Sequence, residues 1–384
     1  MKGTAVLSGV RVIDLSQWLP GPAAGQLLAD LGADVVKVEP PHGDPMRRIG
    51  RLDPDGICVW YKLVNAGKRV VRLDLKSPGG QADFADLLAQ ADVLLESFRP
   101  GTMEKLNFSR ATVRAINPTL VHCALSGFGQ TGPLARKGGH DNNYLALGGN
   151  AALSGGRARP ELIYPPVGDH AASLQAVVGI LAALFRKERQ GKGADLDLSI
   201  METVLAWQAI PLTCDLRGGG EATRGEGLLT GGAAFYRIYE TADRRFVSLG
   251  AIEPKFWAAF CQAVGRDDWL ARQNEALPQT GLIDGLAQLF NSRPLAHWTA
   301  LLADVDCCFE PLLDAPEMLD HPHLKARGQL RHHAADPQTG QEAFVETLFG
   351  GWIDRQPPKA RPAFEECDVA AIASGWGGGA DGGG

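Results

Sequence analysis

Residues 10–39, with the sequence VRVIDLSQWLPGPAAGQLLADLGADVVKVE, decide the fold of this 384-residue chain. The first six and the last six of them are rich in Val, Ile and Leu and have strand length, and residues 23–31 have the apolar spacing of a helix. A strand, a helix and a second strand in this order predict a βαβ unit of the kind that binds nucleotides. The glycine pattern of a dinucleotide site is missing, and Pro20 and Pro22 offer no N–H group to a pyrophosphate, so we do not expect NAD.

Strands and helices keep alternating as far as residue 199. Further strands are expected at 69–75, 93–96, 120–125 and 194–199, and helices at 79–89, 111–116, 175–188 and 202–210. This alternation is typical of an α/β fold with a parallel, Rossmann-like sheet. In such sheets ligands lie beyond the carboxyl ends of the strands, so the loops that follow the strands are expected to carry the site.

The chain divides into a large and a small predicted domain. Residues 1–216 form the large α/β domain, and a glycine-rich linker opens residues 217–324, a small α+β domain. The elements expected beyond residue 216 are a hairpin at 235–249, helices at 255–264, 281–290 and 295–302, and a strand at 342–348. Residues 325–376 are expected to rejoin the large domain, and residues 377–384 are a flexible Gly-rich tail.

The composition is that of a globular protein with a large core, 45% hydrophobic and 21% charged. The formal net charge of -6 gives no basic excess, so nucleic acid is not an expected partner. No apolar stretch resembles a signal peptide, and the longest apolar run, residues 176–185, is too short to span a bilayer. We therefore expect a cytoplasmic protein with no membrane partner.

Neither a disulfide framework nor a metal site is expected. The seven cysteines are scattered, odd in number and without Cys-x-x-Cys spacing, which is typical of reduced thiols. The histidine pairs at residues 321–323 and 332–333 have no Asp or Cys at ligand spacing, so we predict no metal.

Two residues stand where groups that line a cleft are often found. His140 follows two glycines, and Asp169 follows the sequence Pro-Pro-Val-Gly. Because glycines let a backbone come close to a ligand, a His and an Asp in such positions could move protons on either side of a bound carbon. From spacing alone, the simpler alternative is that both are ordinary loop residues.

The N-terminal half of the chain resembles the class III CoA-transferase family (CaiB/BaiF-like) over about two hundred residues. The matching blocks are Pro20-Gly21-Pro22, residues 31–40, Gly67-Lys68-Arg69, residues 73–78, Phe98-Arg99-Pro100-Gly101, Ile116-Asn117-Pro118, Ser126-Gly127-Phe128-Gly129 and Gly191-Lys192-Gly193. The resemblance implies a parallel-sheet large domain, a small domain and an obligate, interlocked homodimer. It also implies an acyl-CoA thioester as substrate, with CoA entering as part of that substrate and no other cofactor.

Within that family the chain looks like the α-methylacyl-CoA racemase branch. Residues 139–147 and residues 231–254 carry this resemblance. It implies three catalytic residues, His140, Asp169 and Glu253. The first two would exchange protons with the two faces of the carbon next to the thioester, and Glu253 would orient the histidine.

The proposed proton chemistry sets two conditions on the site. Asp169 must be protonated for part of the cycle, so burial is expected to raise its pKa. Negative charge that develops on an enolate needs hydrogen-bond donors, and we expect backbone N–H groups after Gly168, at the start of a helix, to supply them.

The resemblance also gives expectations for CoA itself. Arg99 follows a strand, where its guanidinium could bind a phosphate. Lys76 and Lys105 match positions that contact CoA in the family, and the backbone around Leu73 and Leu75 would hold the adenine. A surface lysine that serves only solubility is the alternative for Lys105.

The sequence leaves two reactions open. One is racemisation or epimerisation of a 2-methylacyl-CoA by 1,1-proton transfer through an enolate. The other is CoA transfer between carboxylic acids, in which Asp169 attacks the thioester to form an acyl anhydride and then an aspartyl-CoA thioester. A CoA-binding regulatory module is the non-enzymatic alternative.

Overall fold

The structure is a computed structural model that describes residues 5–218, 223–336, 342–348 and 350–377. Most of the predicted Gly-rich tail, and Gly219 and Gly220 of the predicted linker, lie outside the described residues.

The chain forms two compact units. The first contains Met1–Tyr144, Pro165–Val204 and Leu319–Gly384, and the second contains Leu145–Tyr164 and Leu205–Met318. The chain therefore passes between the units more than once.

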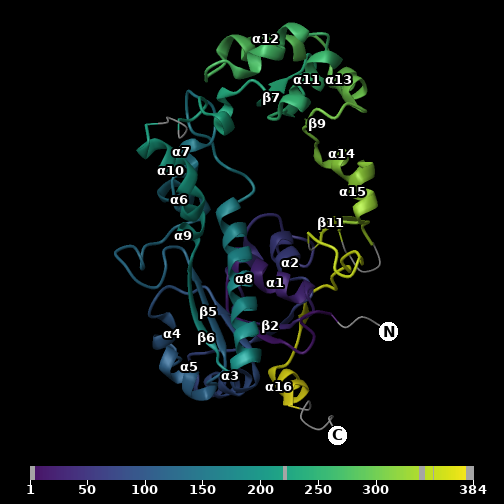
Figure 1. The fold of residues 1–384 in the computed structure, drawn as a ribbon. Helices are drawn as coiled ribbons and strands as arrows, with labels where there is room; N and C mark the ends of the chain where they lie inside the picture. Colours follow the sequence, from purple (N-terminus) through teal and green to yellow (C-terminus); the bar gives the residue numbers. More distant parts are fainter. Residues whose placement is uncertain (1–4, 219–222, 337–341, 349, 378–384) are drawn as a thin grey trace. The chain divides into compact units, whose positions relative to one another are not determined.

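A seven-stranded sheet in the order β12-β3-β2-β1-β4-β5-β6 forms the centre of the first unit (Figure 1). Its strands are β1 (Arg11–Asp14), β2 (Asp34–Glu39), β3 (Arg69–Arg72), β4 (Val93–Glu96), β5 (Val121–Ser126), β6 (Ala194–Ser199) and β12 (Glu365–Glu366). All neighbouring strands in it are parallel. The predicted α/β fold with a parallel sheet is confirmed, and its order places β12, near the C-terminus, beside β3.

Helices cover both faces of this sheet. Those of the first unit are α1 (Pro20–Asp30), η1 (Pro45–Arg48), α2 (Val59–Asn65), α3 (Pro78–Gln90), α4 (Thr102–Lys105), α5 (Arg110–Ile116), α8 (Val167–Gln190), α15 (Pro322–Arg327) and α16 (Val369–Gly377), together with most of α6 (Asp141–Leu147) and α9 (Ile200–Leu205). Val12 and Val35 point to a core shared with α1 and α8, whereas the next residues along the strands, Ile13 and Val36, point to a core shared with α3 and α16. Alternate side chains thus bury both faces, which is why these strands are nearly continuous apolar runs.

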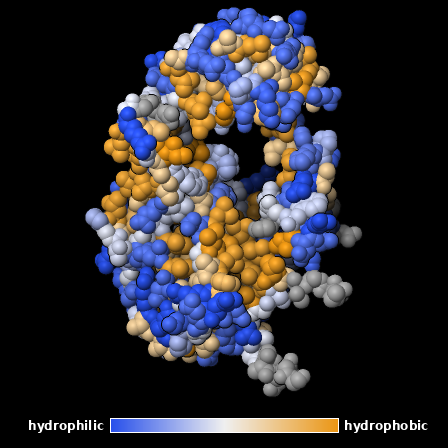
Figure 2. Space-filling view, viewed as in Figure 1, coloured by the Kyte–Doolittle hydropathy of each residue, from blue (hydrophilic) through white to orange (hydrophobic). Residues whose placement is uncertain are grey.

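The long helix α8 is apolar enough and long enough to cross a membrane by length and composition alone. Its buried side chains, among them Ala172, Ala176 and Ile180, pack into the core beneath the sheet. Leu174, Val178 and Phe185 lie on its other side and are exposed, and Figure 2 shows an apolar patch over this helix. The buried face identifies α8 as a helix of the protein core.

The second unit contains an antiparallel sheet covered by helices. Its strands are β7 (Tyr236–Glu240), β8 (Phe246–Gly250) and β9 (Phe309–Pro311), and its α-helices are α7 (Asn150–Leu153), α10 (Ala209–Leu216), α11 (Pro254–Ala263), α12 (Thr280–Phe290) and α13 (Leu295–Leu302). It also contains the 3-10 helices η2 (Ala206–Gln208) and η4 (Asp267–Asn274) and the π-helix η3 (Leu228–Gly232). α14 (Ala315–Asp320) links the two units along the chain. The predicted hairpin is confirmed as β7 and β8.

Three short strands were not predicted. β9 has three residues and β12 has two, too few for an alternating pattern to show. β10 (Leu330–His333) has the polar sequence Leu-Arg-His-His, and it pairs with β11 (Phe344–Thr347), which lies within the predicted strand 342–348.

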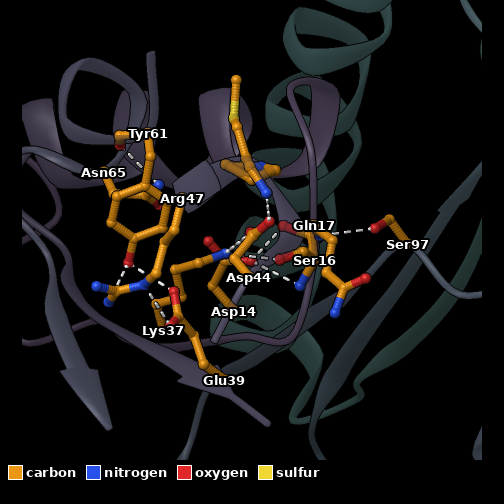
Figure 3. Close-up of polar contacts among 12 residues, drawn as sticks. Asp14, Ser16, Gln17, Lys37, Glu39, Asp44, Arg47, Tyr61, Asn65 and Ser97 are labelled. Carbon is orange, nitrogen blue, oxygen red and sulfur yellow. Dashed lines mark hydrogen bonds and ion pairs between the residues drawn. The ribbon is translucent and has the colours of Figure 1, made fainter. Parts of the chain in front are cut away.

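A cluster of buried charges lies where β1 and β2 end (Figure 3). Lys68 Nζ is 2.9 Å from Asp14 Oδ2, and Lys37 Nζ is 3.0 Å from Asp44 Oδ2. Burial acts to raise the pKa of Asp14, but the positive charges of Lys68 and Lys37 outweigh it and lower that pKa. Since a buried charge needs a partner, this cluster fixes the chain segments that hold its members.

Candidate active site

A cavity of about 520 Å³ lies in the first unit. It is lined by residues that follow β1 (Gln17 and Trp18) and by residues that follow β4 (from Ser97 to Pro100). The order of the sheet reverses between these two strands. Such a switch point is where parallel α/β sheets bind their ligands, so the cavity is the candidate active site.

His140 and Asp169 both line this cavity. His140 immediately precedes α6, and Asp169 lies in the first turn of α8 rather than in the loop before it. Burial, and then the charge of Asp141, raise the pKa of Asp169 to about 7. The expectation that burial raises this pKa is confirmed, even though a helix N-terminus by itself favours the ionised carboxylate.

Asp141 lies directly beside the first turn of α8, which carries the carboxyl group of Asp169. Its Oδ1 accepts a 2.9 Å hydrogen bond from the backbone N–H of Asp169. A Cβ atom on Gly168 would come within 2.9 Å of the same oxygen, so the glycine makes room for this approach. Asp141 therefore satisfies one of the N–H groups that the start of a helix leaves without a partner.

We expected backbone N–H groups after Gly168 to donate hydrogen bonds to an enolate. This expectation is wrong for the first two of these N–H groups. The N–H of Asp169 donates to Asp141, and the N–H of His170 donates to the carbonyl of Pro166 at 3.1 Å. The first donor is thus occupied by a side chain of α6, and the second by the carbonyl of the residue that precedes α8.

The surroundings of His140 are aromatic and amide groups. Its backbone N–H donates to Asn143 Oδ1 at 3.0 Å, and its ring lies edge-on to Trp18, with ring centroids 6.2 Å apart. Tyr144 donates a 2.6 Å hydrogen bond to the carbonyl of Gly139, which fixes the backbone just before the histidine. Burial, and then the charge of Asp169, raise the pKa of Tyr144 to about 12, so this hydroxyl stays protonated and remains a donor.

A smaller cavity of about 240 Å³ holds three of the predicted CoA residues, Leu73, Leu75 and Lys76. Gln17 and Phe98 line both this cavity and the larger one, so the two share a wall. The predicted phosphate ligand Arg99 lines the larger cavity.

Two predicted site residues are placed elsewhere. Lys105 is the last residue of α4 and lies outside the residues that line the two cavities, although Thr102 of the same helix lines the smaller one. Glu253 belongs to the second unit, where it immediately precedes α11. Its role toward His140 stays a prediction.

A third cavity of about 610 Å³ lies between α2 and the β10–β11 pair. Its polar groups are already paired with one another: His333 Nε2 is 3.1 Å from Glu346 Oε2, and Lys62 Nζ is 2.6 Å from Asp53 Oδ2. Within the described ranges, no three His, Cys, Asp or Glu side chains converge as metal ligands.

Two residues of the site were missed in the sequence. Asp141 stands next to His140 in a matched block, and that adjacency was the available signal. Trp18 follows β1 at the switch point of the sheet, which only the observed strand order reveals.

Comparisons with known proteins agree with this picture. The model of the CoA-transferase family III matches residues 7–363. A Mus musculus protein named alpha-methylacyl-CoA racemase is 36% identical over 332 residues, which are 84% of this chain and 81% of the mouse protein. The succinyl-CoA–D-citramalate CoA-transferase of Chloroflexus aurantiacus is 34% identical over 343 residues, 87% of this chain and 85% of that protein.

Among solved structures, a CaiB/BaiF family protein from Brucella suis is similar with a TM-score of 0.82 and 27% identity, covering 97% of this chain and 100% of that one. Racemases and CoA-transferases are thus matched at similar identity, while the family itself is matched over nearly the whole chain. The chain belongs to the CoA-transferase family III.

Proposed function

We propose that this protein is an acyl-CoA racemase or epimerase that inverts the α-carbon of a 2-methylacyl-CoA by 1,1-proton transfer. The observation that carries the proposal is that His140 and Asp169, two groups able to exchange protons, line one cavity. A relative 36% identical over most of the chain bears the name alpha-methylacyl-CoA racemase, which supports the choice of substrate class.

The proposed reaction runs through an enolate. One of the two side chains removes the α-proton, which the thioester carbonyl makes weakly acidic, and the other returns a proton to the opposite face. The imidazole of His140 has ring nitrogens that can accept or donate a proton, and burial raises the pKa of the Asp169 carboxyl to about 7, so this carboxyl can be present in either protonation state near neutral pH. Glu253 is proposed to orient His140, and CoA enters as part of the substrate.

CoA transfer is the second candidate, because a relative 34% identical is a CoA-transferase. In that reaction the carboxylate of Asp169 is the nucleophile and must be ionised. Racemisation is preferred because His140 lines the same cavity as Asp169, and CoA transfer through an ionised carboxylate has no step that needs this histidine.

The deciding experiment compares wild type with His140→Ala. A 2-methylacyl-CoA is incubated in deuterated water, with and without free carboxylic acids as CoA acceptors. A racemase exchanges the α-proton and inverts the centre without an acceptor, and His140→Ala should lower both by on the order of 10²–10⁴-fold. CoA transfer that survives His140→Ala, with no α-exchange by wild type, would replace this proposal with the transferase. Asp169→Ala is expected to be inactive under either reaction and serves as the blank.

A homodimer is also proposed. Leu174, Val178 and Phe185 on α8 are 56%, 60% and 67% exposed and lie on one side of the helix, since they are spaced by four and seven residues. An apolar stripe of this kind is typical of a surface that another protein surface covers. The family resemblance supports a second copy of this chain as the cover.

A further inference from the structure

Trp18 lies at the wall of the active-site cavity, beside His140. The centroid of its indole ring is 6.2 Å from the centroid of the imidazole, and the two ring planes meet at 86°. Edge-on contacts of this kind favour one mutual angle of two rings. Within the described parts of the chain, the imidazole has no hydrogen-bond partner, so this contact is what orients it.

The backbone of Trp18 is strained. Its φ is +64°, in the left-handed region that bulky side chains rarely adopt. For a residue with a Cβ atom this conformation is unfavourable, because the Cβ atom comes too close to the following carbonyl oxygen. Such a residue persists only where its surroundings hold it in place, and strain of this kind gathers at functional sites.

The two residues before the tryptophan are anchored from three strands (Figure 3). Lys37, from β2, donates a 2.7 Å hydrogen bond to the carbonyl of Ser16. The N–H of Ser16 donates to Asp14 Oδ1, at the end of β1, at 2.9 Å. The N–H of Gln17 donates to the hydroxyl of Ser97, after β4, at 2.9 Å. The buried charge cluster therefore fixes the chain that enters Trp18.

The residues after the tryptophan are anchored as well. The hydroxyl of Ser173 on α8 lies 2.7 Å from the carbonyl of Pro20 and 2.9 Å from the carbonyl of Asp169. A Cβ atom on Gly21 would lie 2.2 Å from the Cβ atom of Ser16, so only glycine allows the start of α1 to pack this closely. The same contacts thus tie the segment around Trp18 to the turn that carries Asp169.

We propose that Trp18 is a positioning residue, whose ring holds the imidazole of His140 at the angle at which it exchanges a proton with the acyl group. This inference rests on the proposed function. The backbone on both sides of the tryptophan is held by contacts with β1, β2, the residue after β4 and α8, while its ring is 41% exposed and His140 is exposed as well. The edge-on contact with this anchored residue restricts the imidazole without any hydrogen bond.

The strained backbone allows a sharp choice of variants. Trp18→Gly removes the ring while relieving the strain, since glycine adopts positive φ freely, and the variant is expected to fold because this relief offsets part of the lost packing and of the greater freedom of the unfolded chain. Trp18→Phe keeps an aromatic ring and should restore what Trp18→Gly loses. Trp60→Ala is the matched control, because Trp60 is 52% exposed on α2 and lies outside the active-site cavity.

The first measurement reads the contact itself, without activity. The imidazole ¹H and ¹³C signals of His140, assigned with His140→Gln, are recorded in histidine-labelled protein. Trp18→Gly should lose the ring-current displacement of these signals, while Trp18→Phe keeps part of it and Trp60→Ala keeps all of it. Unchanged His140 signals in Trp18→Gly would overturn the proposal by themselves.

The second measurement separates the two faces of the substrate. α-Proton exchange is followed from each enantiomer of a 2-methylacyl-CoA, and the enantiomer served by His140 is the one whose exchange collapses in His140→Gln. For that enantiomer, Trp18→Gly should lower kcat by roughly 10–100-fold with little change in KM, within the range of general acid–base help. The other enantiomer, served by Asp169, should change much less.

The outcomes distinguish this inference from the proposed function. An equal fall for both enantiomers would mean that Trp18 supports the whole cavity and does not position His140. If wild type exchanges neither enantiomer, the proposed function fails, and the His140 signals still decide whether Trp18 holds the ring. Loss of exchange from one enantiomer together with the spectral change supports the proposal.

Discussion

The backbone N–H of Asp169 donates a 2.9 Å hydrogen bond to Oδ1 of Asp141. This bond joins the first turn of α8 to the residue that follows His140, so it holds the two proposed proton-exchanging groups in one frame. It also places a second negative charge beside the carboxyl of Asp169, whose pKa is about 7. Asp141 therefore both fixes the position of Asp169 and adjusts its proton affinity.

Asp141→Asn should move the pH dependence of the reaction to lower pH. Asparagine keeps an oxygen that accepts the N–H of Asp169 but carries no charge. In this variant Asp169 stays buried, and burial is the largest cause of its raised pKa. The negative charge of Asp141 is lost, so the pKa of Asp169 should fall. The measurement is the rate of α-proton exchange by wild type and variant over a pH range of about 5 to 9.

The matched control for this shift is Asp83→Asn, which removes one charge from an exposed position of α3. Its pH profile should coincide with that of wild type. A profile that moves equally in both variants would mean that net charge, and not the contact with Asp169, sets the pH dependence.

Asp169→Asn should make the protein inactive but more stable at alkaline pH. A carboxyl whose pKa is raised in the folded state binds more protons folded than unfolded, so stability falls as the pH rises from about 4 to about 7. Removing the carboxyl removes that cost, and the free energy of unfolding at pH 8 should rise by on the order of 1 kcal/mol. Urea unfolding at pH 8 checks this result.

The same titration at pH 4 is the internal control, because the carboxyl is then protonated in the folded protein. The difference between Asp169→Asn and wild type should shrink there. A difference that is constant with pH would show that packing, and not ionisation, accounts for the change.

Much of the fold could be predicted because the central strands are buried on both faces. The strands at 34–39 and 93–96 were predicted with the bounds that β2 and β4 have in the structure, and the edge strand β6 (194–199) was found from its alternating apolar pattern. β9 could not be predicted, because it pairs with β8, which is distant in the chain, and β10 could not be predicted, because its sequence Leu-Arg-His-His has no apolar alternation. For such short strands tertiary contacts decide.

The residues of the site also differ in whether the sequence could predict their roles. Resemblance led to His140 and Asp169, and the structure brings both to one cavity. The contribution of Asp141 depends on a hydrogen bond across 28 residues. The proposed contribution of Trp18 depends on its positive backbone angle φ, in a segment anchored by the buried charge cluster. Neither a single backbone angle nor a hydrogen bond between distant residues leaves a pattern in the sequence.

Arg99→Ala should weaken binding of the CoA ester by roughly 1.5–3 kcal/mol if Arg99 makes a charge-assisted contact with a phosphate. Arg99 lines the active-site cavity, and the overall charge of the protein is negative, so anion binding depends on such local cations. The measurement is KM for the ester, beside Lys192→Ala in the exposed turn after α8. An unchanged KM in folded Arg99→Ala would place the phosphates elsewhere.

Val178→Glu should convert the proposed dimer into monomers. Val178 lies in the middle of the exposed apolar stripe of α8 and is 60% exposed. If a second copy covers the stripe, the new carboxylate would be buried without a partner, at a cost of several kcal/mol per interface. Sedimentation velocity at micromolar concentration should show a dimer for wild type and for the control Lys192→Glu, and a monomer for Val178→Glu. Because an obligate interface in this family should bury more than about 2,000 Å², a wild-type protein that sediments as an active monomer would contradict the proposed assembly.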